Sequence, residues 1–317
     1  MKYFFITILH GLELEHKKNK GIKLHNNARV SNGKEILKEV FDNDLSKSTL
    51  GSHSIDEFDG TTYCYLRGED ENIKTFEDAN NFSNENQFGF LRYAQHLTYN
   101  LWLKKDHSIY VRDGFLFVYS DEISDGWTYK ASVSAVISRA NGEVKGNTIF
   151  SDDDIKDASD ASLFIMNSYK DTEDKGKMPT SNILYKDYSS SRFTRAYYFV
   201  LNARGTSIAP MKIVFYCNAL EALFTTDNSE VVHKISERAA LLMGQNSKER
   251  KEIFKDIKHA YNIRSKIVHG ESIKSKDVGG VCEQLDIYLR IIFTKYDHIF
   301  NRNDNELNEF YNNLLFD

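Results

Sequence analysis

The sequence predicts an α+β protein with two domains, in which a mixed β-rich N-terminal domain precedes an all-helical bundle. Short stretches rich in aromatic and β-branched residues fill the chain before residue 150. After residue 191, apolar residues recur mainly at three- and four-residue steps, which is the period of amphipathic helices. A length of 317 residues is sufficient for two domains with separate cores.

The first domain is expected to span residues 1–150 and to contain several strands. Two stretches within it, 33–41 and 86–105, have helical periodicity. Asn141-Gly142 is a favourable turn pair and predicts a hairpin between 132–137 and 143–150. Other stretches have the composition of strands: 3–9, 61–67, 108–112, 114–120 and 128–138.

The second domain is expected to span residues 151–317, with its core in 192–300. A helix is predicted to start at Asp152 and to reach residue 169, and the polar stretch 171–191 is predicted to be a loop. The long apolar stripe of 276–300 is typical of a helix in a bundle. The other helices predicted for this domain are 192–203, 209–224, 230–243, 248–268 and 305–315.

Composition points to an ordinary cytoplasmic protein. The three cysteines, Cys64, Cys217 and Cys282, are too widely spaced to indicate a zinc site or a disulfide framework. No stretch is long and apolar enough to cross a membrane. The apolar run 1–9 lacks a small-residue cleavage site and is expected to be the first strand. We therefore expect no metal, no cofactor and no membrane partner.

The most informative motif is Arg264 and His269 near the end of the 248–268 helix. Arg264 continues the apolar series of that helix, where arginine is rare unless it is paired. Gly270 follows directly, as a helix-ending glycine does. In an unbroken helix His269 lies about 140° from Arg264, so the two converge only if the helix ends there or a second copy faces the first. The alternatives are a structural ion pair for Arg264 and a dipole-complementing role for His269.

Glu221 is the candidate partner of Arg264. It lies within the apolar stripe of 209–224, four residues after Cys217. Two charged residues of opposite sign on apolar stripes predict a buried ion pair, in which Glu221 would orient the guanidinium. A glutamate at the edge of the stripe, in contact with water, is the alternative.

Basic residues are concentrated around the motif. Residues 248–276 contain nine Lys and Arg against four Asp and Glu. An RNA backbone favours such an excess, and we assign Lys258, Lys266 and Lys274 to RNA binding. A solvated amphipathic face has the same composition, so the pattern supports RNA binding only weakly.

The residue types match cleavage of RNA by its own 2′-hydroxyl. Histidine titrates near neutral pH and transfers protons. Arginine stays charged and has a fork that matches phosphate oxygens, so it stabilises the charge that develops on phosphorus.

Residues from about 192 to 300 resemble the HEPN domain, most closely its ApeA-like branch. The resembling segments are NALEALF at 218–224, HKISERAALLMG at 233–244 and YNIRSKIVHG at 261–270. The family places an R-x4-6-H motif near a helix end, usually with Asn, Asp or His after the arginine, where this chain has Ser265. The resemblance implies an all-helical, usually dimeric domain that commonly acts as a metal-independent RNase.

We therefore expect a metal-independent endoribonuclease with Arg264 and His269 catalytic and with Glu221 and Ser265 in support. The resemblance implies a role in bacterial antiphage defence, by abortive infection, or as a toxin. It also implies RNA and a second copy as partners, a phage-derived trigger or an antitoxin nucleotidyltransferase, and a sensory or regulatory role for residues 1–150. The alternatives are an inactive HEPN module that binds RNA or nucleotide and dimerises, and an enzyme whose site lies in the N-terminal half.

Overall fold

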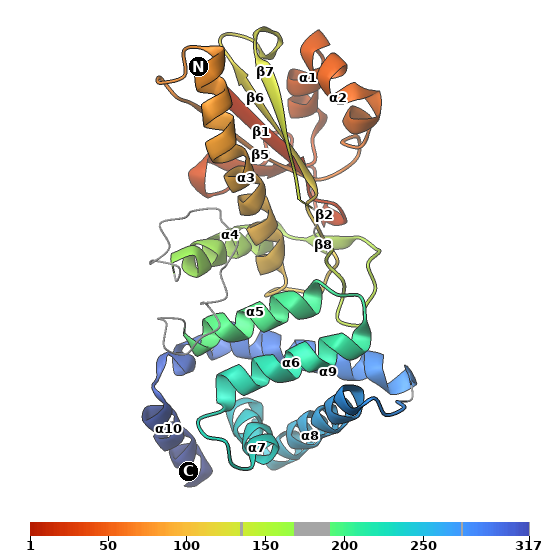
Figure 1. Cartoon of the computed structure of the whole chain (residues 1–317), viewed down its shortest axis with the longest axis vertical. Coiled ribbons are helices and arrows are strands. Elements are labelled where there is room, and N and C mark those ends of the chain that lie inside the picture. Colours follow the sequence, from red (N-terminus) through yellow and green to blue (C-terminus); the bar gives the residue numbers. More distant parts are fainter. Residues whose placement is uncertain (134–135, 168–190, 274, 317) are drawn as a thin grey trace. The chain divides into compact units, whose positions relative to one another are not determined.

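The computed structural model describes residues 1–133, 136–167, 191–273 and 275–316 (Figure 1). The chain divides into two compact units. Unit 1 comprises Met1–Ala135 and Lys145–Lys177, and unit 2 comprises Val136–Val144 and Met178–Asp317. This division differs from the boundary expected after residue 150, because a short segment before that point belongs to unit 2 and a longer one after it belongs to unit 1.

Unit 1 is built on a six-stranded antiparallel sheet of order β3-β4-β5-β1-β6-β7. The central strand β1 pairs with its two long neighbours, β5 and β6, so that Phe4 lies opposite Arg67 of β5 and Phe117 of β6. The strands are β1 (Lys2–Ile8), β3 (Ile22–Lys23), β4 (Ala28–Ser31), β5 (Tyr63–Glu69), β6 (Asp113–Tyr119) and β7 (Trp127–Ser132).

Both faces of this sheet are buried. Side chains alternate along β1, so that Phe5 belongs to one core and Phe4 and Ile6 belong to the other. Helix α3 (Phe76–Leu101) covers the first face, and α1 (Lys34–Phe41) and α2 (Asp44–Asp56) lie at the second (Figure 1). Unit 1 also contains two short 3-10 helices, His25–Asn27 and Ile123–Asp125.

Helix α3 begins ten residues before the predicted start. Its N-terminus is a capping box, in which the Asp78 backbone N–H donates to Thr75 Oγ1 at 3.2 Å and the Thr75 N–H donates to the Asp78 carboxylate at 2.9 Å. The residues that follow are mostly polar and give little apolar period. The start therefore depends on the cap, which periodicity does not detect.

The predicted hairpin at Asn141-Gly142 is wrong. The turn exists, since the Gly142 N–H donates to the Arg139 carbonyl at 2.9 Å, but the described residues directly on either side of it do not form two strands that pair with each other. Instead β8 (Thr148–Phe150) pairs in parallel with β2 (Leu12–Leu14) of unit 1. A turn pair specifies local geometry, whereas the partner of a strand is chosen by distant residues.

Helix α4 (Asp152–Asn167) packs on α3, which is why it belongs to unit 1 and not to the helical half. Asn100 Nδ2 donates to the Ala158 carbonyl at 3.2 Å, and the Tyr93 hydroxyl lies 3.2 Å from Ser159 Oγ. His25 also contacts Asp160, with 2.6 Å between Nε2 and Oδ1. These contacts cross a long sequence separation that composition alone does not reveal.

The long C-terminal segment of unit 2 is helical. Its helix bounds agree with the predicted ones to within a few residues, except that the helix predicted to end at residue 300 ends at Lys295. Central helix α6 packs against α5, α7, α8 and α9, which surround its buried residues such as Cys217 and Leu220. The helices are α5 (Arg192–Arg204), α6 (Ala209–Phe224), α7 (Val231–Met243), α8 (Ser247–His269), α9 (Ser275–Lys295) and α10 (Asp304–Phe316), with a 3-10 helix at Asp297–Asn301.

A buried acid connects two of these helices. Asp286 of α9 is fully buried, accepts a hydrogen bond from the Tyr216 hydroxyl of α6 at 2.9 Å and forms an ion pair with Arg290. A buried carboxylate is stable only when it is paired and hydrogen-bonded in this way. The contact therefore fixes the position of α9 along α6.

Asp286→Ala should lower the free energy of unfolding by about 3 kcal/mol or more, because it removes one partner of a buried ion pair. Glu283→Ala is the matched control, since Glu283 is an exposed acid of the same helix, and should change stability by less than about 0.5 kcal/mol. Urea unfolding followed by circular dichroism measures both. Equal effects would show that the Asp286 contact contributes nothing specific.

Candidate functional site

Helix α8 carries the predicted motif and has well-defined ends. At its start, Asn246 Oδ1 accepts the backbone N–H groups of Lys248 and Glu249, both at 3.0 Å. At its end, Gly270 has a φ of 74°, and the Glu271 N–H donates to the Lys266 carbonyl at 2.9 Å. These bonds form a glycine C-cap directly after His269, so the predicted helix end is confirmed.

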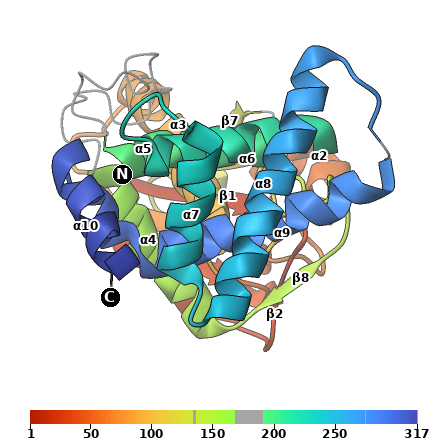
Figure 2. The ribbon, with the colours of Figure 1, turned by 90° about the horizontal axis from the view of Figure 1, so that it is seen from below.

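The inner face of α8 is buried along most of its length but not at the end. Ile253, Ile257, Ala260 and Tyr261 are buried, whereas Val268 is 56% exposed, although periodicity placed it on the same stripe. In Figure 2 the C-terminal turns of α8 extend beyond α6 and α9, which explains this exposure. The motif therefore lies where the helix leaves the core.

Arg264 occupies the boundary between core and solvent. It is half-buried and lies one turn after Tyr261, whose hydroxyl donates to the Cys217 carbonyl at 3.1 Å. Burial raises the pKa of Tyr261 well above its ordinary value, and the charge of Glu221 adds to that rise while the charge of Arg264 opposes it. Burial also raises the pKa of Cys217, with the same two opposing influences. Glu221 and Arg264 therefore act on the same two side chains.

The direct ion pair expected between Glu221 and Arg264 is not formed. Among the described residues, no salt bridge within 4 Å joins them, and Glu221 is only half-buried. Tyr261 explains the difference, because its ring and hydroxyl fill the space between α8 and α6 one turn before Arg264. Apolar spacing placed the two charges on facing stripes, and Tyr261 on the same stripe as Arg264, but it does not predict which side chains meet between the two helices.

The guanidinium of Arg264 has an unused donor. Its Nε is buried and has no hydrogen-bond partner within the described part of the chain. An unpaired buried donor costs about 1–3 kcal/mol, so such groups are rare in native structures and require an explanation. The residue as a whole is only half-buried, so part of it is open to solvent, where a phosphate could bind the guanidinium.

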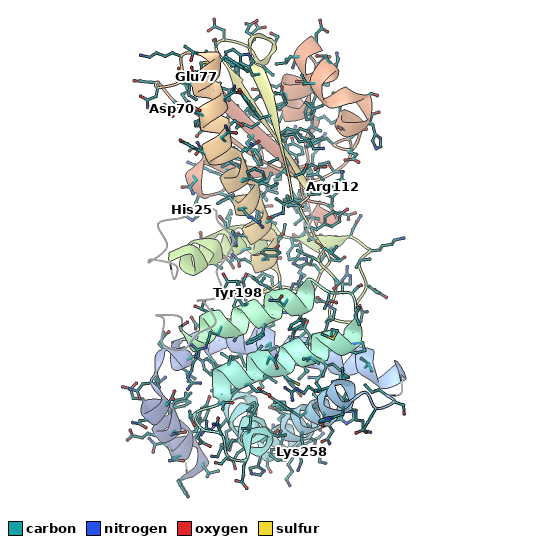
Figure 3. The ribbon with its side chains drawn as sticks, viewed as in Figure 1. His25, Asp70, Glu77, Arg112, Tyr198 and Lys258 are labelled. Carbon is teal, nitrogen blue, oxygen red and sulfur yellow. The ribbon has the colours of Figure 1, made fainter. Side chains whose placement is uncertain are left out.

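His269 is exposed and does not share a face with Arg264. Since α8 is helical through residue 269, the five-residue spacing places the two side chains about 140° apart. Ser265 and Lys266 are exposed between them, and Lys258 lies on the outer side of the helix (Figure 3). Lys274 lies outside the described residues. One copy thus brings Arg264, Tyr261 and Glu221 together but leaves His269 apart.

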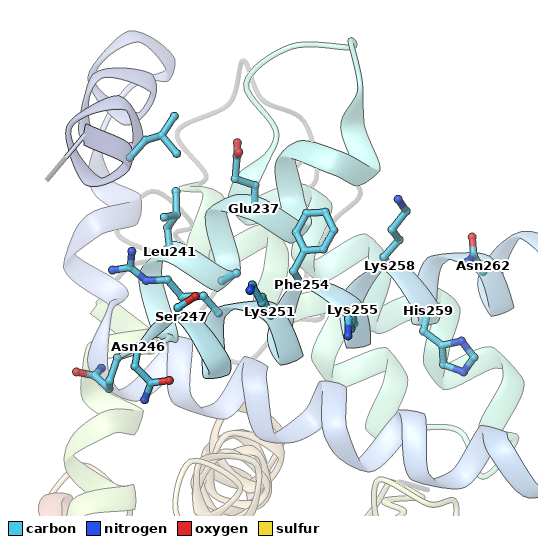
Figure 4. Close-up of a pocket in the computed structure, with 14 residues that line it drawn as sticks. Glu237, Leu241, Asn246, Ser247, Lys251, Phe254, Lys255, Lys258, His259 and Asn262 are labelled. Carbon is cyan, nitrogen blue, oxygen red and sulfur yellow. The ribbon is translucent and has the colours of Figure 1, made fainter.

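Sequence reasoning missed a groove between α7 and α8 (Figure 4), which has a volume of about 820 Å³. Its apolar part includes Leu241 and Phe254, and one acid, Glu237, lies at its edge. Lys251 and Lys255 lie four residues apart, and therefore on one face of the predicted helix. That spacing was the sequence signal that could have located the groove. Basic or polar side chains contributed by α8 complete the lining: Arg250, Lys251, Lys255, Lys258, His259 and Asn262.

Neither a candidate metal site nor a membrane-spanning helix is found among the described residues. They contain no group of three or more His, Cys, Asp or Glu side chains placed to hold a metal ion. None of their helices combines the length and the apolarity that a membrane span needs.

Comparisons with protein-family models, with curated proteins and with solved structures found no match to this chain. The site is therefore interpreted from its own geometry.

Replacement of Arg264 distinguishes a structural arginine from one available to a ligand. Arg264→Met keeps the apolar stem and removes the guanidinium, whose Nε has no partner, so the free energy of unfolding should change by less than about 1 kcal/mol. Tyr261→Phe, which loses the bond to the Cys217 carbonyl, should cost about 1 kcal/mol. Both are measured by urea unfolding. A loss of about 3–5 kcal/mol in Arg264→Met would mean that the arginine forms a buried structural pair.

Proposed function

We propose that this protein is a metal-independent endoribonuclease of the HEPN type, with Arg264 and His269 as its catalytic residues. The observation that carries the proposal is the state of Arg264. It is a half-buried arginine with an unused buried donor, about one and a half turns before a capped helix end that presents an exposed histidine.

The roles follow from the chemistry of the two side chains. In this reaction the 2′-hydroxyl attacks the adjacent phosphorus, so the nucleophile is already positioned within the substrate. His269 is exposed and exchanges protons with the 2′-hydroxyl or the leaving 5′-oxygen. Arg264 keeps its charge and contacts the phosphate oxygens, where negative charge grows in the transition state.

A dimer completes the site. Because Arg264 and His269 lie about 140° apart on one helix, a facing copy is needed to place an arginine and a histidine on the same phosphate. The N-terminal end of α6 and the C-terminal end of α8 lie at the same end of unit 2 in both ribbon views (Figures 1 and 2). Exposed apolar side chains are available there for contact: Ile208 at 59%, Met211 at 39% and Val268 at 56%.

Other predicted residues take indirect or electrostatic roles. Burial raises the pKa of Tyr261 and the charge of Glu221 adds to the rise, so we assign Glu221 a supporting role beside Tyr261, one turn before Arg264. Ser265 is exposed beside Arg264 and can donate to a phosphate oxygen. Lys258 and Lys266 are exposed and supply positive charge for the backbone of RNA.

The biological setting in this proposal comes from the family resemblance. A ribonuclease of this type would act in the cytoplasm, in antiphage defence by abortive infection or as a toxin. Unit 1 would then sense a phage-derived trigger or restrain the nuclease, and an antitoxin nucleotidyltransferase would be a candidate partner. Two well-formed cores in unit 1 support a domain with a task of its own.

The second candidate function is a HEPN module that binds RNA or nucleotide and dimerises without cleaving. The separation of Arg264 and His269 around α8 favours it, because a single copy presents only the arginine beside Tyr261. A non-cleaving module would require the same dimer but no proton transfer.

The deciding test is RNA cleavage in excess EDTA. Wild-type protein should cut total tRNA or a structured mRNA and leave 2′,3′-cyclic phosphate ends. His269→Ala should reduce the rate by about 10²–10⁴-fold, because proton transfer is lost. His298→Ala is the control, since that histidine is also exposed in unit 2, with 68% of its side chain accessible, and should cut as wild type does.

Two results would contradict the proposal. Equal cleavage by wild type and His269→Ala would assign the activity to another site or a contaminant. No cleavage by folded, dimeric wild-type protein, combined with RNA binding that is unchanged in His269→Ala, would establish the non-cleaving module.

A further inference from the structure

The solvent face of α8 carries a single line of polar side chains that ends at His269. Lys251, Lys255, Lys258, Asn262 and His269 are all exposed and follow one another at four, three, four and seven residues. At about 100° per residue these steps keep them within about 40° of one line along the helix. The line is about 27 Å long, since each residue rises about 1.5 Å.

The three lysines on this line are not neutralised. Within the described part of the chain, none of them forms a salt bridge. Two of the three acids of α8 are engaged elsewhere: Asp256 accepts from the Tyr288 hydroxyl at 2.7 Å, and Glu249 accepts from the Gln245 N–H at 2.9 Å. The lysine line is therefore a continuous positive strip on an otherwise balanced helix.

A groove with an aromatic ring adjoins the lysine part of the line (Figure 4). Phe254 projects into this groove between α7 and α8, and the Lys258 Nζ lies 5.8 Å from the centre of its ring. The Phe254 ring also makes a T-shaped contact with His233, with 5.5 Å between ring centres. Leu241 and Leu315 give the groove an apolar wall.

We propose that a single-stranded RNA segment binds along this face of α8, with its phosphates on Lys251, Lys255 and Lys258 and one base stacked on Phe254. Single-stranded nucleic acids bind to surfaces that combine a line of positive charge with aromatic rings, because every base has a face that can stack. The strand then continues past Asn262 toward His269. The course of the strand toward His269 rests on the proposed ribonuclease activity. The inference adds Lys251, Lys255 and Phe254 to the binding residues.

An unpaired strand fits better than a duplex. A base within a duplex is stacked on its neighbours and cannot lie on Phe254, whereas a base in a loop or single strand can. An acidic segment of a partner protein would also match the lysines, but carboxylate side chains have no planar ring that can stack on Phe254. The combination of charge and ring therefore favours RNA.

The test is a binding measurement in the His269→Ala background, so that no strand is cut. Fluorescence anisotropy is recorded with a labelled oligouridylate, with a labelled RNA duplex of similar length and with labelled polyglutamate, each over a range of salt concentrations. The first variant reverses the charge of Lys251, Lys255 and Lys258 together. The second is Phe254→Leu, which keeps apolar volume in the groove but removes the ring.

A matched control reverses three exposed lysines of unit 1 that form no salt bridge within the described residues, namely Lys17, Lys20 and Lys23. It changes the net charge by the same amount as the first variant. Circular dichroism of every variant checks that the fold is unchanged. Any difference between the two triple variants then reports the position of the charges and not their number.

The α8 triple variant should weaken oligouridylate binding at least tenfold and lower the slope of log affinity against log salt by about 0.7 for each lysine that contacts a phosphate. Phe254→Leu should weaken oligouridylate binding about 5- to 100-fold, as expected for loss of one stacked base, with little change for the duplex. The unit 1 control should bind within twofold of the parent.

Three outcomes would overturn the inference: equal weakening by both triple variants, no change in Phe254→Leu, or tighter binding of polyglutamate than of RNA at equal salt. The last would assign the face to an acidic protein partner. Oligouridylate binding that depends on the α8 lysines in a protein whose wild type never cuts RNA would remove the ribonuclease proposal and leave the binding face in place.

Discussion

The geometry of one unbroken helix constrains everything proposed for this protein. Helix α8 runs without interruption to a glycine cap directly after His269, so the five residues from Arg264 turn the two side chains about 140° apart. Arg264 therefore faces the core edge at Tyr261, while His269 faces solvent at the end of the polar line. Chemistry that needs both side chains on one phosphate needs a second copy of the chain.

This constraint also relates the two surfaces of α8. On the inner face, the Tyr261 hydroxyl donates to the Cys217 carbonyl one turn before Arg264, whose Nε has no hydrogen-bond partner among the described residues. The outer face holds unpaired lysines beside Phe254 and ends at the histidine. In the proposed arrangement, a strand bound on the outer face of one copy would reach that copy's His269, and the facing copy would bring its Arg264 to the same place.

Much of this could be predicted from the sequence, because helix periods and caps are local signals. The bounds of α8, its cap at Asn246 and its end before Gly270 follow from residues within a few positions. The Glu221–Arg264 pair was wrong because Tyr261 fills the space between the helices, and side-chain volume across an interface leaves no sequence period. The parallel pairing of β8 with β2 was missed for a related reason, since its partners are more than 130 residues apart.

The composite site is tested most directly by mixing two inactive proteins, Arg264→Ala and His269→Ala, after dissociation and reassociation. In a mixed dimer the first chain supplies His269 and the second supplies Arg264, so one complete pair exists across the interface. The account predicts that neither variant cuts RNA alone and that the mixture regains a substantial fraction of wild-type cleavage in EDTA. A mixture as inactive as its components, with mixed dimers demonstrated by mass spectrometry, would contradict it.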